Sequence, residues 1–255
     1  MNFRFLKSLF KKIVKSIFLI SLVAFAISYF QIEKLPNESE MLNELKKDPI
    51  QTKTIVQPFE IEKEGITYII KPLFDYELNG MIVSYHHSSS WLDYYHDKWQ
   101  DYLNIKDICV IWNENIESGI YKKIDFKNGS YTCYIKSKAN MTRDEWQNYR
   151  SDNLSNNHLL TNDEEINKKI LSAKKGDQIY FKGYLVEYSI KDDDFKRGSS
   201  ISRTDNGNGA CETIFIEDFQ ILKRANPLER DIHNTSKYLL LGSFLILTVL
   251  FFKDI

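Results

Sequence analysis

The sequence predicts an α+β fold in which a β-rich domain is flanked by two transmembrane helices. Two observations predict the helices: residues 16–32 carry no charge and follow a basic N-terminus, and residues 238–252 form a second uncharged run. Between them, β-branched and aromatic residues gather in short runs separated by turn residues, with a few stretches of helical spacing. The chain then divides into a basic N-terminus with the first helix (residues 1–32), an exported α+β domain (33–224), a linker (225–236), and the second helix with a short tail (237–255).

Length and composition exclude several classes of protein. The chain has 255 residues, and its 10 glycines and 5 prolines are too few for a collagen-like or low-complexity chain. A net charge of −1 argues against a strongly basic nucleic-acid binder, so we expect no nucleic-acid partner. Three cysteines are too few for a disulfide-dense scaffold. The sequence has no P-loop and no G-x-G-x-x-G motif, and we expect no cofactor.

The first uncharged run has the composition of a membrane-spanning helix. A helix needs about 20 apolar residues to cross the hydrocarbon layer, and Lys15 can extend its side chain towards the headgroups. Only basic charges precede the run: Arg4, Lys7, Lys11, Lys12 and Lys15. They favour a cytoplasmic N-terminus, which places the following domain outside. A signal peptide cleaved after Ala26 is the alternative, and it exports the same domain.

The second uncharged run, residues 238–252, covers about 22 Å of helix. Lys237 and Lys253 can reach the headgroups, so we expect this helix to cross the bilayer as well. A buried core helix or an interfacial helix is the alternative. The basic residues before this run favour the opposite orientation, but the first helix usually decides it.

Strands are predicted over residues 59–86, 106–112, 124–135, 177–188 and 210–222, and helices over residues 36–48, 88–103, 142–150 and 161–173. Asn128-Gly129 is a hairpin signal. Thr161 and Glu164 have the spacing of a capping box. Gly183 predicts a bend inside its strand, and the change of parity between Ile216 and Phe219 predicts a bulge near residues 217–218.

Two resemblances add to these patterns. A bent strand, a long connection and a bulged strand over residues 177–222 resemble an oligonucleotide/oligosaccharide-binding (OB-like) barrel. The stretches LSNNHLLT (154–161), GDQIYFKGYLVEYS (176–189) and RTDNGNGACETIFIEDFQIL (203–222) resemble an uncharacterised family of bacterial membrane-anchored proteins. The second resemblance implies a bacterial envelope setting. Together with the charges before the first helix, we expect the bacterial inner membrane with the main domain in the periplasm; a cytoplasmic domain is the alternative. It supplies no catalytic residue.

The connection over residues 199–212 holds the candidate ligand- or partner-binding residues. They are Ser202, Arg203, Asp205, Gly207, Gly209 and Glu212. The glycines could present backbone amides to an anion, or the carboxylates could hold a cation. Alternatively, the segment is a tight connection whose side chains satisfy its own backbone.

Cysteine and histidine residues suggest further sites. Cys109 and Cys133 lie in predicted strands and could form a disulfide after export, which would leave Cys211 as a buried or reactive thiol; three buried thiols are the alternative. His158 could act as a general base oriented by Asp152 or Asp163, although a local polar network fits it better.

Two other clusters are assigned a structural role. His86, His87 and His96 lack a metal-binding spacing, so no metal site is assigned. The aromatic residues Trp91, Tyr95, Trp99 and Tyr102 share one face of a predicted helix and are assigned to the core.

We therefore expect an integral envelope protein that contacts the lipid bilayer through two helices. Its exported domain is expected to be a non-enzymatic binding or scaffolding module for an envelope protein, peptide or glycan. The alternative is a membrane-anchored hydrolase or transferase that acts on envelope material through Asp205, Glu212 or His158. No catalytic residue is assigned from the sequence.

Overall fold

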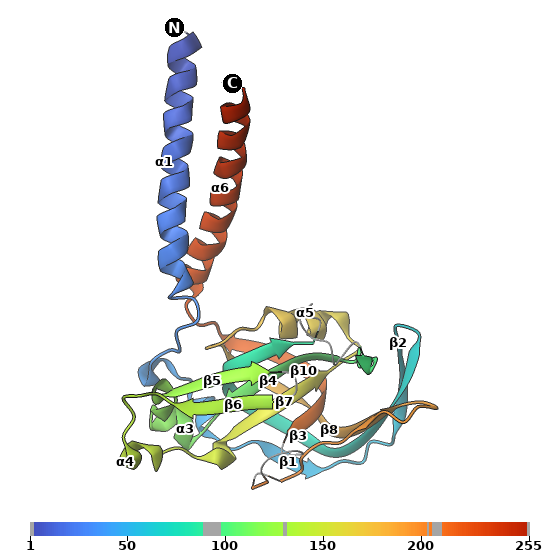
Figure 1. Cartoon of the computed structure of the whole chain (residues 1–255). Coiled ribbons are helices and arrows are strands. Elements are labelled where there is room, and N and C mark those ends of the chain that lie inside the picture. Colours follow the sequence, from blue (N-terminus) through green and yellow to red (C-terminus); the bar gives the residue numbers. More distant parts are fainter. Residues whose placement is uncertain (1–2, 89–97, 130–131, 203, 206–210, 254–255) are drawn as a thin grey trace. The chain divides into compact units, whose positions relative to one another are not determined.

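The computed structural model describes residues 3–88, 98–129, 132–202, 204–205 and 211–253 (Figure 1). The chain forms two compact units, one of residues 1–34 with 225–255 and one of residues 35–224. The expected class is confirmed, because the chain combines a large sheet with a helix near each end.

The first unit consists of two helices, α1 (Phe3–Tyr29) and α6 (Pro227–Phe252), which lie side by side (Figure 1). The rings of Phe25 and His233 stack with centroids 4.4 Å apart, and those of Phe18 and Phe244 are 6.5 Å apart. The Ser28 hydroxyl lies 3.2 Å from Nδ1 of His233.

Among the described residues, only α6 is long and apolar enough to qualify as a membrane span. Two helices of this kind were predicted, and α6 is the one that has the required length and apolar composition. In α1 the basic residues occupy the first half, and the uncharged remainder of the helix, residues 16–29, measures about 21 Å against a hydrocarbon thickness of about 30 Å.

The predicted linker over residues 225–236 is a helix for most of its length. Pro227 occupies the first helical position, where its fixed φ suits the helix and its missing N–H costs nothing. Asn226 turns the chain immediately before it with a φ of 46°. The helix that was expected to begin near residue 237 therefore begins ten residues earlier.

The second unit is built on an eight-stranded sheet. Its strands are β1 (Ile50–Lys53), β2 (Phe59–Lys63), β3 (Ile66–His87), β4 (Asn104–Ile111), β7 (Leu154–Leu160), β8 (Gln178–Ile190), β9 (Lys196–Arg197) and β10 (Glu212–Lys223). A separate hairpin consists of β5 (Ile124–Gly129) and β6 (Thr132–Ser137). The helical segments are η1 (Glu38–Glu40), η2 (Asn43–Lys46), α3 (Glu114–Glu117), η3 (Ile120–Lys123), α4 (Arg143–Trp146), η4 (Ser151–Asn153) and α5 (Glu164–Ser172).

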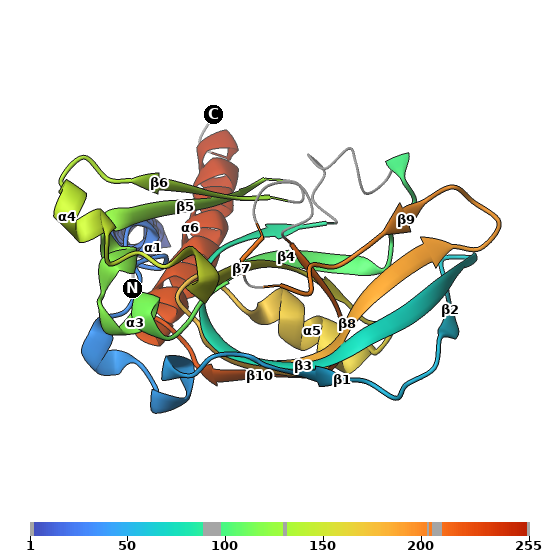
Figure 2. The same ribbon diagram turned by 90° about the horizontal axis from the view of Figure 1, so that it is seen from below.

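Five strands are paired in a cycle. β3 pairs with β4, β4 with β7, β10 with β8 and β8 with β3, all antiparallel, while β7 and β10 pair in parallel. Figure 2 shows β3 and β8 curving together along the sheet. A buried apolar cluster with residues from all five strands, including Ile108, Leu159 and Ile214, forms the main core.

Local geometry explains the curvature. The predicted bulge is confirmed, because the register between β8 and β10 shifts between Ile216 and Asp218. At Gly183, a Cβ atom would lie 2.0 Å from the carbonyl oxygen of Phe215, so only glycine allows the two strands to approach this closely.

Two helix predictions differ from the structure. Residues 36–48 form two short 3-10 segments, η1 and η2, instead of one α-helix. The helix predicted over residues 161–173 is present as α5, but Asp163 caps it by accepting hydrogen bonds from the backbone N–H groups of Glu165 and Ile166. An aspartate next to the first turn replaces the predicted Thr161 and Glu164 capping box.

Candidate functional site

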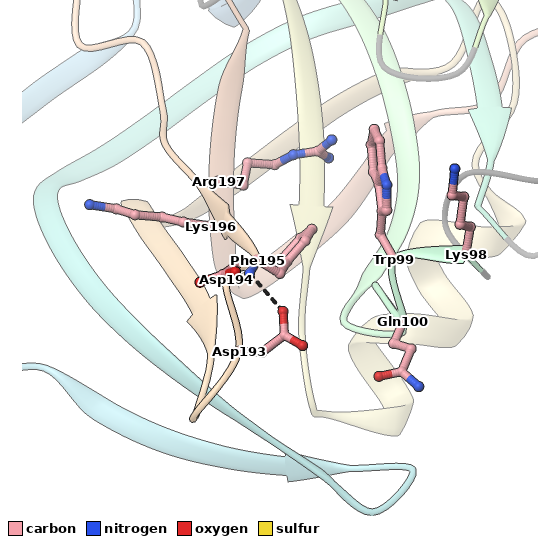
Figure 3. A pocket seen from close by; sticks show the side chains of 8 residues that line it. All are labelled: Lys98, Trp99, Gln100, Asp193, Asp194, Phe195, Lys196 and Arg197. Atoms are coloured by element: carbon pink, nitrogen blue, oxygen red, sulfur yellow. Dashed lines mark hydrogen bonds between the residues drawn. The ribbon is translucent and has the colours of Figure 1, made fainter.

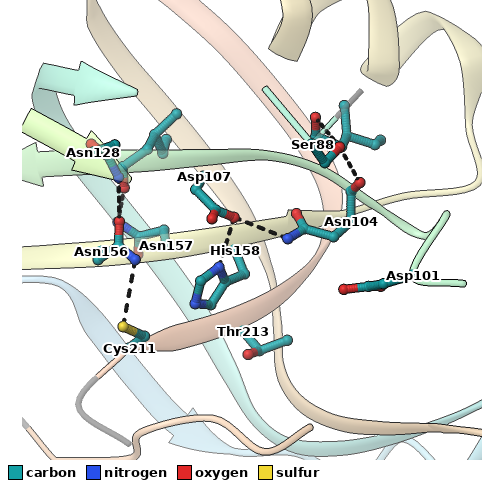
Figure 4. A network of polar contacts seen from close by, with 12 residues as sticks. Ser88, Asp101, Asn104, Asp107, Asn128, Asn156, Asn157, His158, Cys211 and Thr213 are labelled. Carbon is teal, nitrogen blue, oxygen red and sulfur yellow. Dashed lines mark hydrogen bonds and ion pairs between the residues drawn. The ribbon is translucent and has the colours of Figure 1, made fainter. Parts of the chain in front are cut away.

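A network of buried polar side chains lies on one face of β4, β7 and β10 (Figure 4). Side chains alternate between the faces of a strand, and Ile108, Leu159 and Ile214 belong to the main core. Their neighbours Asp107, His158 and Thr213 therefore point to the opposite face. Asp107 is paired with His158 across β4 and β7, and His158 with Thr213 across β7 and β10.

Asp107 and His158 form the centre of this network. Oδ1 of Asp107 lies 2.6 Å from Nδ1 of His158, and both side chains are almost completely buried. The Asn104 amide donates a hydrogen bond of 2.9 Å to the same carboxylate oxygen. The carboxylate is thus fixed on one side by an amide and on the other by the imidazole.

The charge state of His158 follows from these contacts. Burial lowers the pKa of the imidazole, but the charge of Asp107 and its hydrogen bond raise it, and a hydrogen bond with Cys211 raises it further. The guanidinium of Arg197 acts in the opposite direction. Together they raise the pKa of His158 to about 9, so the imidazole is a cation beside the Asp107 carboxylate at neutral pH.

Cys211 lies at the edge of the same network. It precedes β10 by one residue and is two residues from Thr213, which places the two side chains on one face. The Asn156 amide donates to its Sγ atom at 3.4 Å. The Asn128 amide in turn donates to Oδ1 of Asn156 at 2.7 Å, which fixes the orientation of that side chain.

A pocket of about 400 Å³ lies beside this face, between two connections of the sheet (Figure 3). It is lined by Lys98, Trp99 and Gln100 from the β3–β4 connection and by Asp193, Asp194, Phe195, Lys196 and Arg197 from the segment after β8. The positive charge of Arg197, a pocket residue, lowers the pKa of His158. The pocket and the polar network are therefore electrostatically coupled.

Buried polar groups support one wall of the pocket. Nη1 of Arg197 lies 3.6 Å from a carboxylate oxygen of Asp101, which is fully buried. The Tyr188 hydroxyl lies 2.8 Å from both oxygens of the same carboxylate. A carboxylate below the surface therefore holds the guanidinium at the pocket.

The structure describes part of the connection that was predicted as the binding loop. The Ser200 hydroxyl donates to the Asp205 carboxylate at 2.7 Å, and the hydroxyls of Ser202 and Thr204 are 3.1 Å apart. Glu212 is buried at the start of β10. Predictions on three further residues, Arg203, Gly207 and Gly209, lie outside the described residues.

The orienting partner predicted for His158 was wrong. Asp152 forms a salt bridge with Arg150 at 3.0 Å, and Asp163 caps α5. Asp107 contacts the imidazole instead, because the pairing of β4 with β7 places it directly opposite.

The other sequence predictions have separate outcomes. Cys109 and Cys133 form a disulfide between β4 and β6, and Cys211 is not disulfide-bonded. Within the described part of the chain, no group of three His, Cys, Asp or Glu side chains could hold a metal ion. The predictions on Trp91, Tyr95 and His96 concern residues that the structure does not describe. The assignment of Trp99 to the core was wrong, because its side chain is exposed and lines the pocket.

Comparisons with protein-family models, curated proteins and solved structures find no match to this chain.

Sequence reasoning missed Asp107, Asn104 and Tyr188 as members of a site. Each lies in or beside a predicted strand and has no motif around it. Asn156, Asn157 and His158 lie in β7, a strand that was not predicted. The available signal was a polar residue inside a predicted apolar strand, such as Asp107 in residues 106–112.

Proposed function

We propose that this protein is a membrane-anchored binding module of the bacterial envelope, with an OB-like closed sheet. In chain order, the five strands of the cycle are β3, β4, β7, β8 and β10. The third and fifth strands are parallel, and a helix, α5, stands between the third and fourth. This order is that of the five-stranded Greek-key barrel that binds oligonucleotides and oligosaccharides.

The position of the pocket carries the proposal. In this type of barrel, ligands bind to the face of strands two and three and to the loops between strands one and two and strands four and five. The corresponding loops in this chain are the β3–β4 and β8–β10 connections. They supply every residue that lines the pocket of about 400 Å³.

The lining chemistry favours an envelope glycan or peptide that carries carboxylates. Trp99 and Phe195 offer ring faces for sugar or side-chain packing, and Trp99 is 41% exposed. Lys98 and Lys196 supply positive charge at the pocket for carboxylates, whereas the charge of Arg197 is already paired with Asp101. Asp193 and Asp194 lower the net charge of the pocket and disfavour a polyanion such as a nucleic acid.

Replacing Trp99 by alanine is expected to weaken the binding of soluble peptidoglycan fragments at least about tenfold, because the variant loses the largest apolar surface in the pocket. Isothermal titration of the detergent-solubilised full chain measures the affinity. Trp146→Ala is the matched control, since Trp146 lies on α4 and is 39% exposed. Equal affinities for the wild type and Trp99→Ala, or no binding to the wild type, would contradict the proposal.

The proposed anchor consists of both helices. The buried side chains between α1 and α6 include Ser21, Ser28, Ser236 and Ser243, whereas large apolar side chains such as Ile20, Leu245 and Phe252 point outwards. Small polar residues inside and apolar residues outside are typical of helices that pack in a membrane. The basic first half of α1 can lie in the cytoplasmic headgroup region while its second half enters the bilayer with α6.

Fusions test this anchor and its orientation. In a bacterial host, alkaline phosphatase joined after Arg224 is expected to be active, and a fluorescent protein joined after Ile255 is expected to fluoresce, because the domain is outside and both ends are inside. The reciprocal fusions are the controls and should be silent. Fluorescence after Arg224 would place the domain in the cytoplasm and exclude a periplasmic ligand.

A further inference from the structure

The two helices of the proposed anchor run antiparallel (Figure 1). The rings of Phe18 and Phe244 are 6.5 Å apart, and further along α1 the ring of Phe25 stacks on that of His233. The part of α1 that precedes Phe18 therefore lies alongside the part of α6 that follows Phe244. These two segments share one depth along the helix pair.

The two segments differ in charge. Residues 4–15 of α1 contain one arginine and four lysines, and the chain has no Asp or Glu before residue 33. Residues 245–252 of α6 carry no charge, and within them Leu245 is 63% exposed and Phe252 is 69% exposed. This end of the helix pair therefore presents ammonium groups and large apolar side chains together.

Three of the lysines border the contact between the helices. Lys7, Lys11 and Lys15 follow one another at steps of four residues, which places them on one side of α1. Val14 lies three residues after Lys11 on the same side, and it is only 4% exposed. Because α6 is the helix packed against α1, the burial of Val14 marks the side of α1 that faces α6. The three lysines therefore lie along the line where the two helices meet, and Lys11 is partly buried there.

We propose that this end of the helix pair binds an anionic phospholipid of the cytoplasmic leaflet. The phosphate contacts the lysines of α1, and an acyl chain packs along the exposed apolar side chains of α6. The proposal rests on the proposed membrane anchor and its orientation. It is independent of ligand binding in the pocket.

An anionic lipid matches the chemistry of both segments. Ammonium groups near the hydrocarbon layer are costly without a counter-charge, and α1 itself supplies no acidic side chain. A lipid phosphate supplies that charge at the headgroup level, which lysine side chains reach along their own apolar stems. A soluble acidic peptide or a free phosphate ion would match the charge but would leave Leu245 and Phe252 uncovered.

Spin-labelled lipids measure this preference. The full chain is reconstituted into lipid nanodiscs, and electron paramagnetic resonance measures how much phosphatidylglycerol or phosphatidylcholine, each labelled in an acyl chain, the protein immobilises. We expect the association constant of phosphatidylglycerol to exceed that of phosphatidylcholine at least about fivefold, which is about the effect of one lysine at an anionic membrane surface.

Variants of the three lysines test the site itself. Glutamine at Lys7, Lys11 and Lys15 together should bring the two association constants close to each other. Arginine at the same three positions should keep the preference for phosphatidylglycerol, because it retains the charges. An unchanged preference in the glutamine variant, or its loss in the arginine variant, would overturn the proposal.

A matched control removes the same charge from the β-rich domain. It replaces three exposed lysines by glutamine: Lys53, Lys127 and Lys136. The lipid preference of this control should equal that of the wild type. If the control loses as much preference as the α1 variant, the net charge of the chain explains the effect and the proposal is overturned.

The wild-type chain separates failure of this site from failure of the anchor. A chain that does not enter the discs would overturn the anchor and the lipid site together. A chain that enters the discs and immobilises both lipids equally would overturn the lipid site alone. Chains that enter in pairs and immobilise no phosphatidylglycerol would assign this surface to a second copy of the protein instead.

Discussion

Replacing Asp107 by alanine is expected to lower the free energy of unfolding of the β-rich domain by about 3–5 kcal/mol, because it leaves the buried His158 cation without its carboxylate. Both side chains are almost completely buried, so water cannot replace the lost partner. Urea unfolding of the solubilised full chain, followed by circular dichroism, measures the change. Glu60→Ala is the matched control: its 3.0 Å pair with Lys191 is about half exposed, and its loss should cost less than about 1 kcal/mol.

The same pair gives a pH dependence with a defined sign. Because folding raises the pKa of His158 to about 9, the group stabilises the folded state fully below its unfolded pKa of about 6.5. This contribution is lost as the pH rises through about 9. Lys106, whose pKa burial lowers to about 7, acts in the opposite sense between about 7 and 10.5.

Comparing the wild type with Asp107→Ala separates the pH dependence due to His158 from that due to Lys106. Lys106 is present in both the wild type and Asp107→Ala, so the difference in unfolding free energy between them should be largest below pH 6.5 and should shrink towards pH 9 and above. A difference that is constant from pH 6 to pH 9.5 would show that the imidazole does not change its charge in this range.

Local features of the fold were predictable, whereas the full set of strands and pairings that form the cycle was not. The parity change near residues 217–218 acts within one strand, and the predicted bulge is present. Gly183 pairs with Ile216 beside this bulge, where a side chain would collide with Phe215. The cycle depends on β3, which continues without interruption through Pro72 and Gly80. Pro72 is tolerated because the register between β3 and β8 shifts between Pro72 and Phe74.

The site was less predictable than the fold because it depends on strand register. His158 was identified as a candidate base, yet its carboxylate partner lies 51 residues earlier in the sequence. Only the pairing of β4 with β7 and of β7 with β10 brings Asp107 and Cys211 to it. Lys106 likewise becomes a structural residue through packing: its ammonium donates to the carbonyl oxygens of Ile170 and Ala173 at the end of α5.

Removing the Cys109–Cys133 disulfide is expected to lower the free energy of unfolding by about 3 kcal/mol. The bond joins β4 of the sheet to β6 of the hairpin and closes a loop with a sequence separation of 24 residues. Closing a loop of this size restricts the unfolded chain by about that amount. Urea unfolding of the wild type with and without dithiothreitol measures the loss directly.

Two variants make this measurement specific and relate it to the compartment. The double variant Cys109→Ala with Cys133→Ala should show no effect of dithiothreitol, whereas Cys211→Ala, which keeps the disulfide, should show the full effect. Because disulfides persist in oxidising compartments, chains isolated from bacterial membranes should carry the bond without added oxidant. Chains that reach the membrane with Cys109 and Cys133 reduced would contradict the proposed periplasmic location of the domain, even if its binding function were correct.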